Sequence, residues 1–555
     1  MRKARLITLI VFLSVIALIL VLRLLDLNIR QRTFLLNQSK ARTLRTVEIP
    51  AYRGMVLDRN GQPISISAPV DSAWINPQEF SISTEVLQKL AASLQINPKV
   101  IFQKQKQYLM REFVYLKRNI SPETANVIKA LDIPGLYFQR DYKRYYPHAE
   151  VDAHVIGFTN VDDQGQEGLE LGYNTWLSGT AGSKQILRDR LGHVIANVAN
   201  LKRPKPGHDL ILSIDQRLQY VAYYQLKKTV KQYQAKAGSI VILDVETGEI
   251  LAMVNQPSYN PNNRSQYPMK NFRNRAVTDT FEPGSTIKPF NLAYALESRK
   301  YTPYTIINTN PGWMMVDGHE IRDEGLNYGK ITLTQLLQKS SNIGAAKVML
   351  SLSPEKYRRL LGKVGFGELT TSDFPGESTG RLPRHSRWKP IETATIAFGY
   401  GLTVTPLQLA SAYMVFATGG VRKPVTFLKN VGDNADAPAE RVMSSRTANQ
   451  LLHMMEKVVQ KNGTGRRARI SGYRVAGKTG TAYLAGAHGY SGYHYVASFV
   501  GIAPVSRPRL IVAVVLRDPK GQHFGGIVAA PLFSEVMKEC LRLLNVPPDS
   551  RDHAI

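Results

Sequence analysis

Three short motifs that lie far apart in this chain constrain its fold most strongly, because their joint chemistry requires one shared cleft. In chain order they are Ser285-Thr286-Ile287-Lys288, Ser340-Ser341-Asn342 and Lys478-Thr479-Gly480-Thr481. One such segment means little, because serine and lysine are common residues. The ordered set S-x-x-K, S-x-N and K-T-G supplies a nucleophile, a proton relay and an anion-binding strand for acyl transfer.

The first motif has the features of an activated nucleophile. Glu282-Pro283-Gly284 is typical of a turn that delivers Ser285 to a helix N-terminus, where free N–H groups favour negative charge. Lys288 lies one turn later on the same face, so we expect its amine to reach the Ser285 hydroxyl. A serine needs a base to remove its proton, and Lys288 is a base only when neutral. We expect burial and a nearby cation, Lys478, to lower the pKa of Lys288.

A second S-x-x-K tetrad, Ser353-Pro354-Glu355-Lys356, shows that the pattern also arises without chemistry. Its serine is predicted to cap a helix whose first residue is Pro354. No S-x-N follows this tetrad. We therefore assign the nucleophile to Ser285.

The second motif is expected to carry the proton relay. Only Ser340 stands two positions before Asn342, so its hydroxyl is predicted to pass a proton from the Lys288 side to the leaving amine. Asn342 is predicted to hydrogen-bond the substrate amide. Ser258-Tyr259-Asn260 also fits S-x-N, but it precedes the nucleophile and is typical of a turn.

The third motif is expected on an edge strand that lines the cleft. Lys478 would provide a fixed positive charge, and the hydroxyls of Thr479 and Thr481 would bind a carboxylate. Gly480 would let the substrate backbone approach closely. The backbone N–H groups of Ser285 and Thr481 are predicted to form an oxyanion hole, in which one donor contributes about 3 to 4 kcal/mol.

Composition limits the cofactors and partners of the chain. Cys540 is the only cysteine, which excludes an intrachain disulfide and a cysteine-built metal site, and we predict no metal or other cofactor. The formal net charge of +28 favours contact with anionic surfaces such as lipid head groups or acidic glycan. We find no basic run with interleaved aromatic residues, so nucleic acid is not an expected partner. At 555 residues, two or three folded units are expected.

The N-terminus predicts a membrane anchor. Basic residues at positions 2, 3 and 5 precede an apolar run, Leu6–Leu22, whose helix would span about 26 Å, close to a bilayer core. A cleaved signal peptide is the alternative, but the run continues into Arg23-Leu24-Leu25-Asp26 without a small-residue cleavage site. The basic residues before the run favour a cytoplasmic N-terminus. We therefore expect the rest of the chain to lie outside the cytoplasm.

The region after the anchor lacks a catalytic constellation and is predicted to be a rigid spacer and docking surface. Asn60-Gly61 between apolar runs predicts a two-residue hairpin turn in which both residues have positive φ. Short helices are expected over 83–131, with Pro98 and Pro122 at helix starts. Asp189-Arg190-Leu191-Gly192-His193 resembles a second turn between strands.

The C-terminal part of the chain predicts one mixed α/β domain. Early strands (238–244 and 250–254), helix-rich sequence and late strands (496–502 and 510–516) suggest an antiparallel sheet completed from both ends. A closing helix is expected from about Leu532. The predicted division of the chain is an anchor at 1–27, a non-catalytic pedestal domain at 28–215, a catalytic domain at 216–545 and a tail at 546–555.

The motifs and their surroundings resemble those of a known family. The three motifs are similar to those of penicilloyl-serine transferases, and the run 273–285 resembles division-specific class B penicillin-binding proteins. Residues 53–61 and Gly168-Leu169-Glu170 resemble that family's pedestal module. The resemblance implies an α/β (α+β) fold of the penicillin-binding/β-lactamase-like type. Its central antiparallel sheet is flanked by helices, after an elongated mixed pedestal and one N-terminal transmembrane helix.

The resemblance also implies a function. It implies a peptidoglycan D,D-transpeptidase that cross-links stem peptides during septal cell-wall synthesis through an acyl-serine intermediate. The donor would be a stem peptide ending in D-Ala-D-Ala, and β-lactams would acylate the same serine, Ser285. The implied partners are a SEDS-family glycan polymerase and divisome membrane proteins. The implied location is the bacterial inner membrane at the division septum, with a single span and a periplasmic catalytic domain.

Other functions would use the same motifs. They are an elongation-type transpeptidase and a serine hydrolase of the same fold, either a D,D-carboxypeptidase or a β-lactamase. Class A β-lactamases deacylate with the glutamate of E-x-x-L-N, and Asp323-Glu324-Gly325-Leu326-Asn327 is similar to it. That segment lies upstream of Ser340, so we interpret it as coincidental. A non-catalytic role as sensor or scaffold is not expected, because all residues of the three motifs are intact.

One position departs from the family pattern. Many relatives have a basic residue where this chain has Tyr483, so it stays open whether a cation beyond Lys478 helps to bind the substrate carboxylate. Tyr400, Gly401 and the loop 481–495 are weaker candidates for the wall of the cleft.

Overall fold

The chain forms two compact units that interleave along the sequence. Our computed structural model describes residues 2–188, 194–324, 327–384, 388–430, 439–486 and 489–550, so the turn predicted at 189–193 lies outside it. The first unit comprises Met1–Gly54, Ser67–Lys143 and Ser178–His208, and the second comprises Met55–Ile66, Arg144–Leu177 and Asp209–Ile555. These units do not coincide with a single cut near residue 215, because two early segments pack with the later part of the chain.

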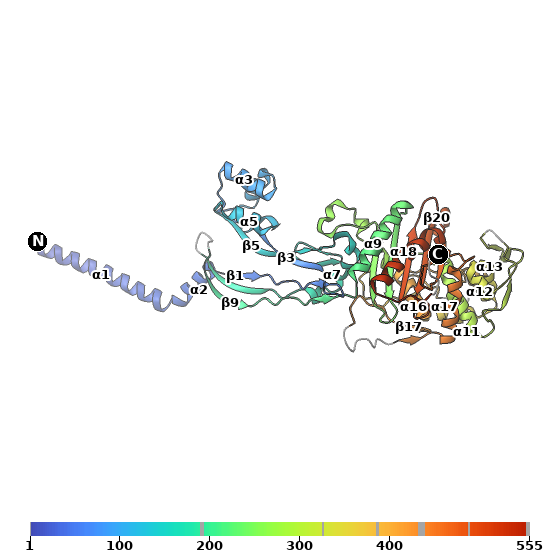
Figure 1. Ribbon diagram of the computed structural model, residues 1–555. Coiled ribbons are helices and arrows are strands. Elements are labelled where there is room, and N and C mark those ends of the chain that lie inside the picture. The colour runs from blue at the N-terminus through green and yellow to red at the C-terminus, as the bar shows by residue number, and fades with distance from the viewer. Residues whose placement is uncertain are drawn as a thin grey trace. The chain divides into compact units, whose positions relative to one another are not determined.

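The first unit begins with a helix that is long and apolar enough to cross a membrane. α1 (Arg2–Ile29) contains the 27-residue apolar span Lys3–Ile29, none of which is buried against the protein (Figure 1). A helix of this length extends about 40 Å, which exceeds a bilayer core of about 30 Å. By length and composition, α1 fits the predicted anchor.

The remainder of the first unit contains two small sheets. After α2 (Arg32–Thr43), the first sheet has three antiparallel strands: β1 (Leu44–Ile49), β8 (Gly182–Arg188) and β9 (Val194–Lys202). The second sheet joins the later part of a long strand to two others: β3 (Pro63–Ile75), β4 (Val114–Ile120) and β5 (Leu136–Tyr145).

Three short helices accompany the second of these sheets: α3 (Thr84–Leu94), α4 (Pro98–Gln107) and α5 (Pro122–Lys129). Pro98 and Pro122 occupy helix starts, as predicted, and the side chains of Asn97 and Ser121 cap these helices by accepting backbone N–H bonds. Apolar residues of the helices and strands share one core, which includes Ile75, Leu90, Leu94, Ile101, Leu116 and Ile128.

The second unit is built on a five-stranded antiparallel sheet in the order β12-β11-β21-β20-β19. Its strands are β11 (Ala237–Asp244), β12 (Ile250–Gln256), β19 (Ala476–Gly486), β20 (Gly489–Ala503) and β21 (Leu510–Arg517). Early β11 pairs with late β21, from Ala237 opposite Arg517 to Asp244 opposite Leu510. The sheet is therefore completed from both ends of the unit, as predicted, and β19 lies at its edge.

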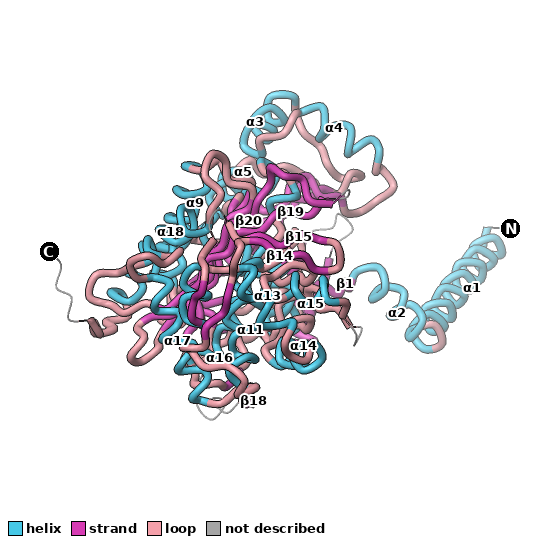
Figure 2. The backbone as a smooth tube through the Cα atoms, turned by 90° about the vertical axis from the view of Figure 1, so that its right-hand side faces the viewer, coloured by secondary structure: helices cyan, strands magenta, loops and turns pink. Residues whose placement is uncertain are grey.

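Alternate residues of the central strands fill two separate hydrophobic clusters. Because successive side chains of a strand point to opposite faces, Val241 and Leu243 lie in one cluster and Ile240 and Ile242 in the other. Three helices cover the sheet, two on one face and the third on the other (Figure 2): α9 (Gln216–Gln232), α18 (Gly525–Leu543) and α16 (Pro406–Ala417). Full burial of one such aliphatic side chain contributes about 1.5–3 kcal/mol.

The predicted hairpin at Asn60-Gly61 forms, but its turn differs from the prediction. β2 (Val56–Leu57) pairs antiparallel with the start of β3, and of the two turn residues only Gly61 has positive φ, at 82°. The Asp58 carboxylate accepts the N–H groups of Asn60 and Gln62 at 2.8 Å each. Asp58 therefore stabilises a wider turn in which Asn60 does not adopt the left-handed conformation.

A buried ion pair joins early segments of the second unit. The Arg144 Nε donates to Glu170 Oε1 at 2.6 Å, and these side chains are 1% and 0% exposed. The Ser65 hydroxyl donates to the same oxygen at 2.7 Å, and α7 (Gly168–Gly172) carries Glu170. Removal of one partner from such a pair costs about 3–5 kcal/mol. The segment 168–170 therefore has a structural role in this unit.

The chain between β12 and β19 contains most of the helices of the second unit. The remaining helices of the second unit are η1 (Ala149–Val151), α6 (Ala153–Ile156), α8 (Asn174–Leu177), η2 (Pro261–Gln266), η3 (Met269–Asn271), α10 (Arg275–Thr278), η4 (Gly284–Ile287), α11 (Lys288–Glu297), α12 (Leu333–Lys339), α13 (Asn342–Leu350), α14 (Pro354–Lys363), α15 (Pro390–Ile396), α17 (Ser445–Val459) and η6 (Arg466–Ala468). Its short strands are β6 (Phe158–Thr159), β7 (Gly165–Glu167), β10 (Leu210–Ile211), β13 (Ile306–Asn308), β14 (Trp313–Val316), β15 (His319–Arg322), β16 (Lys330–Thr332), β17 (Val421–Arg422) and β18 (Glu440–Arg441). The closing helix α18 starts at Gly525 rather than near Leu532, and it continues through Pro531, a residue that usually interrupts a helix.

Candidate active site

Ser285 lies in the short 3-10 helix η4, directly after a glycine that packs closely against other backbone. Gly284 has a φ of +52°, and its N–H donates to Gly399 O at 3.1 Å. A Cβ at position 284 would lie 3.0 Å from Thr481 O on β19. The glycine therefore allows the nucleophile turn to pack against the K-T-G strand, while Ser285 itself is half-buried and lines a pocket.

The amine of Lys288 is directed toward the S-x-N motif. Residues three apart eclipse one another in a 3-10 turn, which places Ser285 and Lys288 on one side of the segment. Among the described residues, however, no hydrogen bond joins the Ser285 hydroxyl to Lys288 Nζ. The amine instead donates to the backbone oxygen and hydroxyl of Ser340, the latter at 3.2 Å, and to Asn342 Oδ1 at 2.8 Å.

Burial makes Lys288 a base at neutral pH. The side chain is 0% exposed, and this burial lowers the pKa of its amine to about 7, although Asp323 and Glu324 oppose the shift. We expected Lys478 to contribute to this shift. The structure corrects that expectation, because Lys478 is not among the causes of the pKa shift of Lys288. The charge of Lys288 instead lowers the pKa of Lys478.

Lys478 is also fully buried, and its predicted role as a positive charge in the cleft stays a prediction. Burial, and then the nearby Lys288, hold the pKa of its amine well below the ordinary value. Its Nζ donates to Ser340 Oγ at 2.9 Å and to the backbone oxygen and hydroxyl of Thr479 at 3.0 and 3.2 Å.

The Ser340 hydroxyl therefore lies between two amines. It accepts from Lys288 Nζ at 3.2 Å and from Lys478 Nζ at 2.9 Å. Ser340 ends α12 in the left-handed conformation, with a φ of 62°, which turns its side chain into this position. Since a hydroxyl both accepts and donates, Ser340 links the two amines as one proton-transfer path.

Asp323 fixes the S-x-N motif, and its importance was not recognised from the sequence. Its carboxylate accepts the N–H groups of Asn342 and Ile343 at 2.6 and 3.0 Å and the Ser341 hydroxyl at 2.7 Å. Asn342 begins α13, where free N–H groups need such acceptors. These bonds occupy both oxygens of Asp323, so this carboxylate is not positioned to activate a water molecule as the β-lactamase glutamate does.

The K-T-G strand presents two hydroxyls to the pocket. Thr479 and Thr481 alternate with Gly480 along β19, and both threonines line the pocket. The hydroxyl of Thr464 is 2.9 Å from that of Thr479, and the N–H of Gly525, at the start of α18, donates to the Thr481 hydroxyl at 3.1 Å. The edge of β19 opposite β20 pairs with no other described strand.

Gly480 has a different role from the one we predicted. A Cβ there would collide with Ser498 Oγ and would lie 2.9 and 3.0 Å from Thr286 Cγ2 and Pro283 O. The space that glycine leaves is therefore filled by Ser498 of β20 and by the nucleophile turn. Gly480 is not among the residues that line the pocket.

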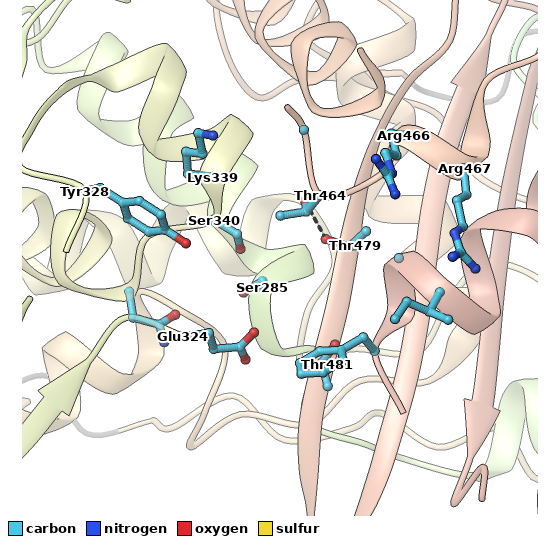
Figure 3. A pocket seen from close by; sticks show the side chains of 15 residues that line it. Ser285, Glu324, Tyr328, Lys339, Ser340, Thr464, Arg466, Arg467, Thr479 and Thr481 are labelled. Carbon is cyan, nitrogen blue, oxygen red and sulfur yellow. Dashed lines mark hydrogen bonds between the residues drawn. The ribbon is translucent and has the colours of Figure 1, made fainter. Parts of the chain in front are cut away.

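The motifs meet at one pocket of about 360 Å³ (Figure 3). This size falls in the usual range for small-molecule sites. The lining residues are Ser285, Glu324, Tyr328, Lys339, Ser340, Asn342, Gly463, Thr464, Arg466, Arg467, Thr479, Thr481, Phe524, Gly526 and Ile527. Lys288 and Lys478 lie behind this lining. Within the described part of the chain, no cluster of three His, Cys, Asp or Glu residues could hold a metal ion.

Sequence reasoning missed the cationic wall of this pocket. Lys339, Arg466 and Arg467 line it, so cations other than Lys478 are present although Tyr483 replaces the usual basic residue. Thr464 and the two arginines belong to a loop and to η6, which lie shortly before the K-T-G motif but more than a hundred residues after the other two motifs in sequence. No local pattern links these segments, and only the packing of α12 and α17 brings them together.

The weaker candidates for the wall of the cleft include tyrosines that make aromatic and hydrogen-bond contacts with one another. Tyr400 OH accepts the Tyr483 N–H at 3.4 Å, and the ring of Tyr483 lies 5.0 Å from that of Tyr495. Tyr495 stacks on His523 at 3.9 Å. Neither Tyr400, Gly401 nor Tyr483 lines the described pocket. Tyr495 is therefore a packing residue in this structure.

Two family models match the chain. Residues 238–538 match the penicillin binding protein transpeptidase domain, and residues 48–212 match the penicillin-binding protein dimerisation domain. A Pseudomonas aeruginosa protein named "Probable peptidoglycan D,D-transpeptidase PbpC" is 42% identical over 95% of this chain and 93% of its own length. The Escherichia coli protein named "Peptidoglycan D,D-transpeptidase FtsI" is 40% identical over 93% of this chain and 88% of its own.

A solved structure supports the same relationship. The crystal structure of a peptidoglycan synthetase from Bifidobacterium adolescentis superimposes with a TM-score of 0.72 and 26% identity. The match covers 92% of this chain and 98% of the other. On the motifs, the fold and the extent of these similarities, the chain belongs to the penicillin-binding protein transpeptidase family.

Proposed function

We propose that this protein is a serine-type peptidoglycan D,D-transpeptidase that cross-links stem peptides through an acyl-enzyme on Ser285. The observation that carries the proposal is the shared hydrogen-bond network of Lys288, Ser340 and Lys478 behind the Ser285 pocket. The relatives with this family's domains that are about 40% identical are named as D,D-transpeptidases, which supports the same conclusion.

In the first half-reaction, Lys288 acts as the base. With a pKa of about 7, much of its amine is neutral at neutral pH and can take the proton of the Ser285 hydroxyl. The serine oxygen attacks the carbonyl of the penultimate D-Ala, and the N–H groups of Ser285 and Thr481 receive the oxyanion. The proton then moves through Ser340 to the leaving D-Ala amine, with Asn342 orienting the peptide.

The pocket is suited to a peptide that ends in a carboxylate. A D-Ala-D-Ala stem peptide would lie along the open edge of β19, as peptides do when they extend a sheet. The hydroxyls of Thr479 and Thr481, with Arg466 and Arg467, supply donors and positive charge for the terminal carboxylate. A β-lactam carries a comparable amide and carboxylate, so it would acylate Ser285 in the same orientation.

The other assignments also belong to this proposal. Residues 1–27 anchor the protein in the inner membrane, 28–215 form a pedestal, 216–545 form the periplasmic catalytic domain and 546–555 form a tail. The apolar helix α1 and the matched dimerisation domain support this division. Septal synthesis with a SEDS-family polymerase and divisome proteins follows from the resemblance of 273–285 to division-specific relatives.

A fluorescent penicillin tests the proposal. We expect one equivalent of label on the full-length chain, a lasting adduct, and mass-spectrometric assignment of that adduct to Ser285. Attachment at another residue would contradict the proposed mechanism. Rapid turnover of the label would instead support the hydrolase alternative, for which Asp323 would have to leave its hydrogen bonds.

A further inference from the structure

One acidic side chain lines the Ser285 pocket. Of the described lining residues, Glu324 alone carries a carboxylate, whereas Lys339, Arg466 and Arg467 carry positive charge. Figure 3 shows Glu324 and Tyr328 on one side of Ser285 and the two arginines on the other. The single carboxylate and the two arginines therefore lie on opposite sides of the nucleophile, and Lys339 lies on the side of Tyr328 and Glu324.

The Glu324 carboxylate has no partner among the described residues. It is exposed and makes no hydrogen bond or ion pair there, in contrast to the adjacent Asp323, whose oxygens bind the S-x-N motif. Its charge nevertheless acts on the catalytic amines. Burial lowers the pKa of both Lys288 and Lys478, and the negative charge of Glu324 opposes this lowering. Glu324 is thus within electrostatic reach of the reaction centre and available to a ligand.

The proposed transpeptidation needs a second substrate that suits this carboxylate. An alkyl amine acceptor carries a positive charge at neutral pH, and it attacks an ester only after losing a proton. A carboxylate attracts the ammonium group and can accept that proton. The carboxylate of the donor peptide, by contrast, is repelled by Glu324 and attracted to the arginines.

We propose that Glu324 binds the ammonium group of the acceptor strand and accepts one proton from it, so that a neutral amine faces the acyl-Ser285 ester. This inference rests on the proposed function and assigns Glu324 to its second half-reaction. Glu324 is then a catalytic residue for aminolysis, and the polarity of the pocket separates the donor side from the acceptor side.

The step balances as follows. The ammonium group gives one proton to Glu324, and the nitrogen lone pair forms a C–N bond to the acyl carbon. The C–Oγ bond of the ester breaks, and its electron pair returns to the Ser285 oxygen. The second amine proton reaches that oxygen through Lys288 and Ser340. The products are the amide cross-link, free Ser285 and one proton on Glu324, which passes to solvent.

A partition experiment tests this role. The full-length chain in detergent receives diacetyl-L-Lys-D-Ala-D-Ala, a donor without a cation, together with glycinamide as a cationic acceptor. Mass spectrometry measures the ratio of amide product to hydrolysis product, which is independent of how fast the acyl-enzyme forms. We expect Glu324→Gln to lower this ratio by about 10- to 100-fold. Glu320→Gln, in an exposed pair with Arg322 outside the pocket, should leave it unchanged.

Hydroxylamine provides the internal control, because this nucleophile is uncharged at neutral pH. The Glu324→Gln variant should keep the ratio of the unaltered protein with hydroxylamine. An equal loss with both nucleophiles would overturn the proposal in favour of a distorted pocket. A higher ratio with glycinamide would also overturn it, because Glu324 would then serve the hydrolytic water. If the unaltered protein formed no adduct with penicillin on Ser285, the proposed function itself would fail.

Discussion

Among the S-x-x-K stretches of this chain, the tetrads at Ser285 and Ser353 lie wholly within the described residues, and their surroundings give them different chemistry. At Ser285 the serine lines a pocket and the lysine is 0% exposed, with its amine bonded to Ser340 and Asn342. At Ser353 the serine caps α14 by accepting the Lys356 N–H at 3.4 Å, and Lys356 is exposed. The four letters place both pairs one turn apart, so burial and neighbouring residues decide which lysine becomes a base.

Replacing the lysine of each tetrad should give the largest difference between the two tetrads in the rate of acylation. Lys288→Met is expected to slow acylation of Ser285 by about 10²- to 10⁴-fold, the usual contribution of a general base. Lys356→Met should acylate at the rate of the unaltered protein. Stopped-flow measurement with a fluorescent penicillin checks both variants. Similar losses in the two would show that lysine burial does not distinguish the tetrads.

The pH dependence of acylation should carry the signature of the buried lysine. Burial lowers the pKa of Lys288 to about 7, and only the neutral amine accepts the serine proton. The acylation rate should therefore be full above pH 7 and fall about tenfold for each pH unit below that value. A pH–rate profile measures this limb. A flat profile between pH 5 and 8 would exclude Lys288 as the base.

Asp323 distinguishes the two tetrads further, because it holds the S-x-N motif that contacts Lys288 and no S-x-N motif follows Ser353. Asp323→Asn is expected to slow acylation about tenfold, since hydrogen bonds to a charged acceptor contribute about 1.5 kcal/mol or more. Asp323 also opposes the shift of Lys288, so the acid limb of the pH–rate profile should move to lower pH. A slower rate with an unmoved limb would contradict the electrostatic part of this role.

The smallest effect is expected at the second tetrad. Ser353→Ala should leave acylation unchanged and destabilise the second unit by about 1 kcal/mol, because α14 loses its N-cap. Thermal unfolding followed by circular dichroism measures the stability, and penicillin labelling measures the acylation. A loss of labelling at intact stability would assign chemistry to Ser353 that the structure does not suggest.

Local patterns were sufficient for much of the fold. Apolar strands at both ends of the second unit predicted the sheet, and proline at positions 98 and 122 predicted helix starts. These features depend on neighbouring residues in sequence. The turn at Asn60-Gly61 was wrong in detail because Asp58, two residues earlier, supplies acceptors that a two-residue rule does not consider.

The electrostatics of the site could not be predicted from the motifs. The burial of Lys478 and its bond to Ser340 depend on packing across the sheet edge. Gly480 was expected to admit substrate, but Ser498 and the nucleophile turn occupy that space. The arginines of η6 reach the pocket only through the packing of the folded chain. Motif spacing does not contain these long-range contacts.

The pairing of β11 with β21 has a consequence for how the protein is made. Ala237 lies opposite Arg517, and the K-T-G strand joins the sheet only through β20, which pairs with β21. A growing polypeptide that has passed Ser285 but has not yet supplied these last strands lacks the β19 edge on which we propose that the peptide binds. Contacts this distant in sequence also form slowly. Drug binding and cross-linking activity therefore appear together and late in biogenesis, and a chain that stops short of about residue 517 would have neither.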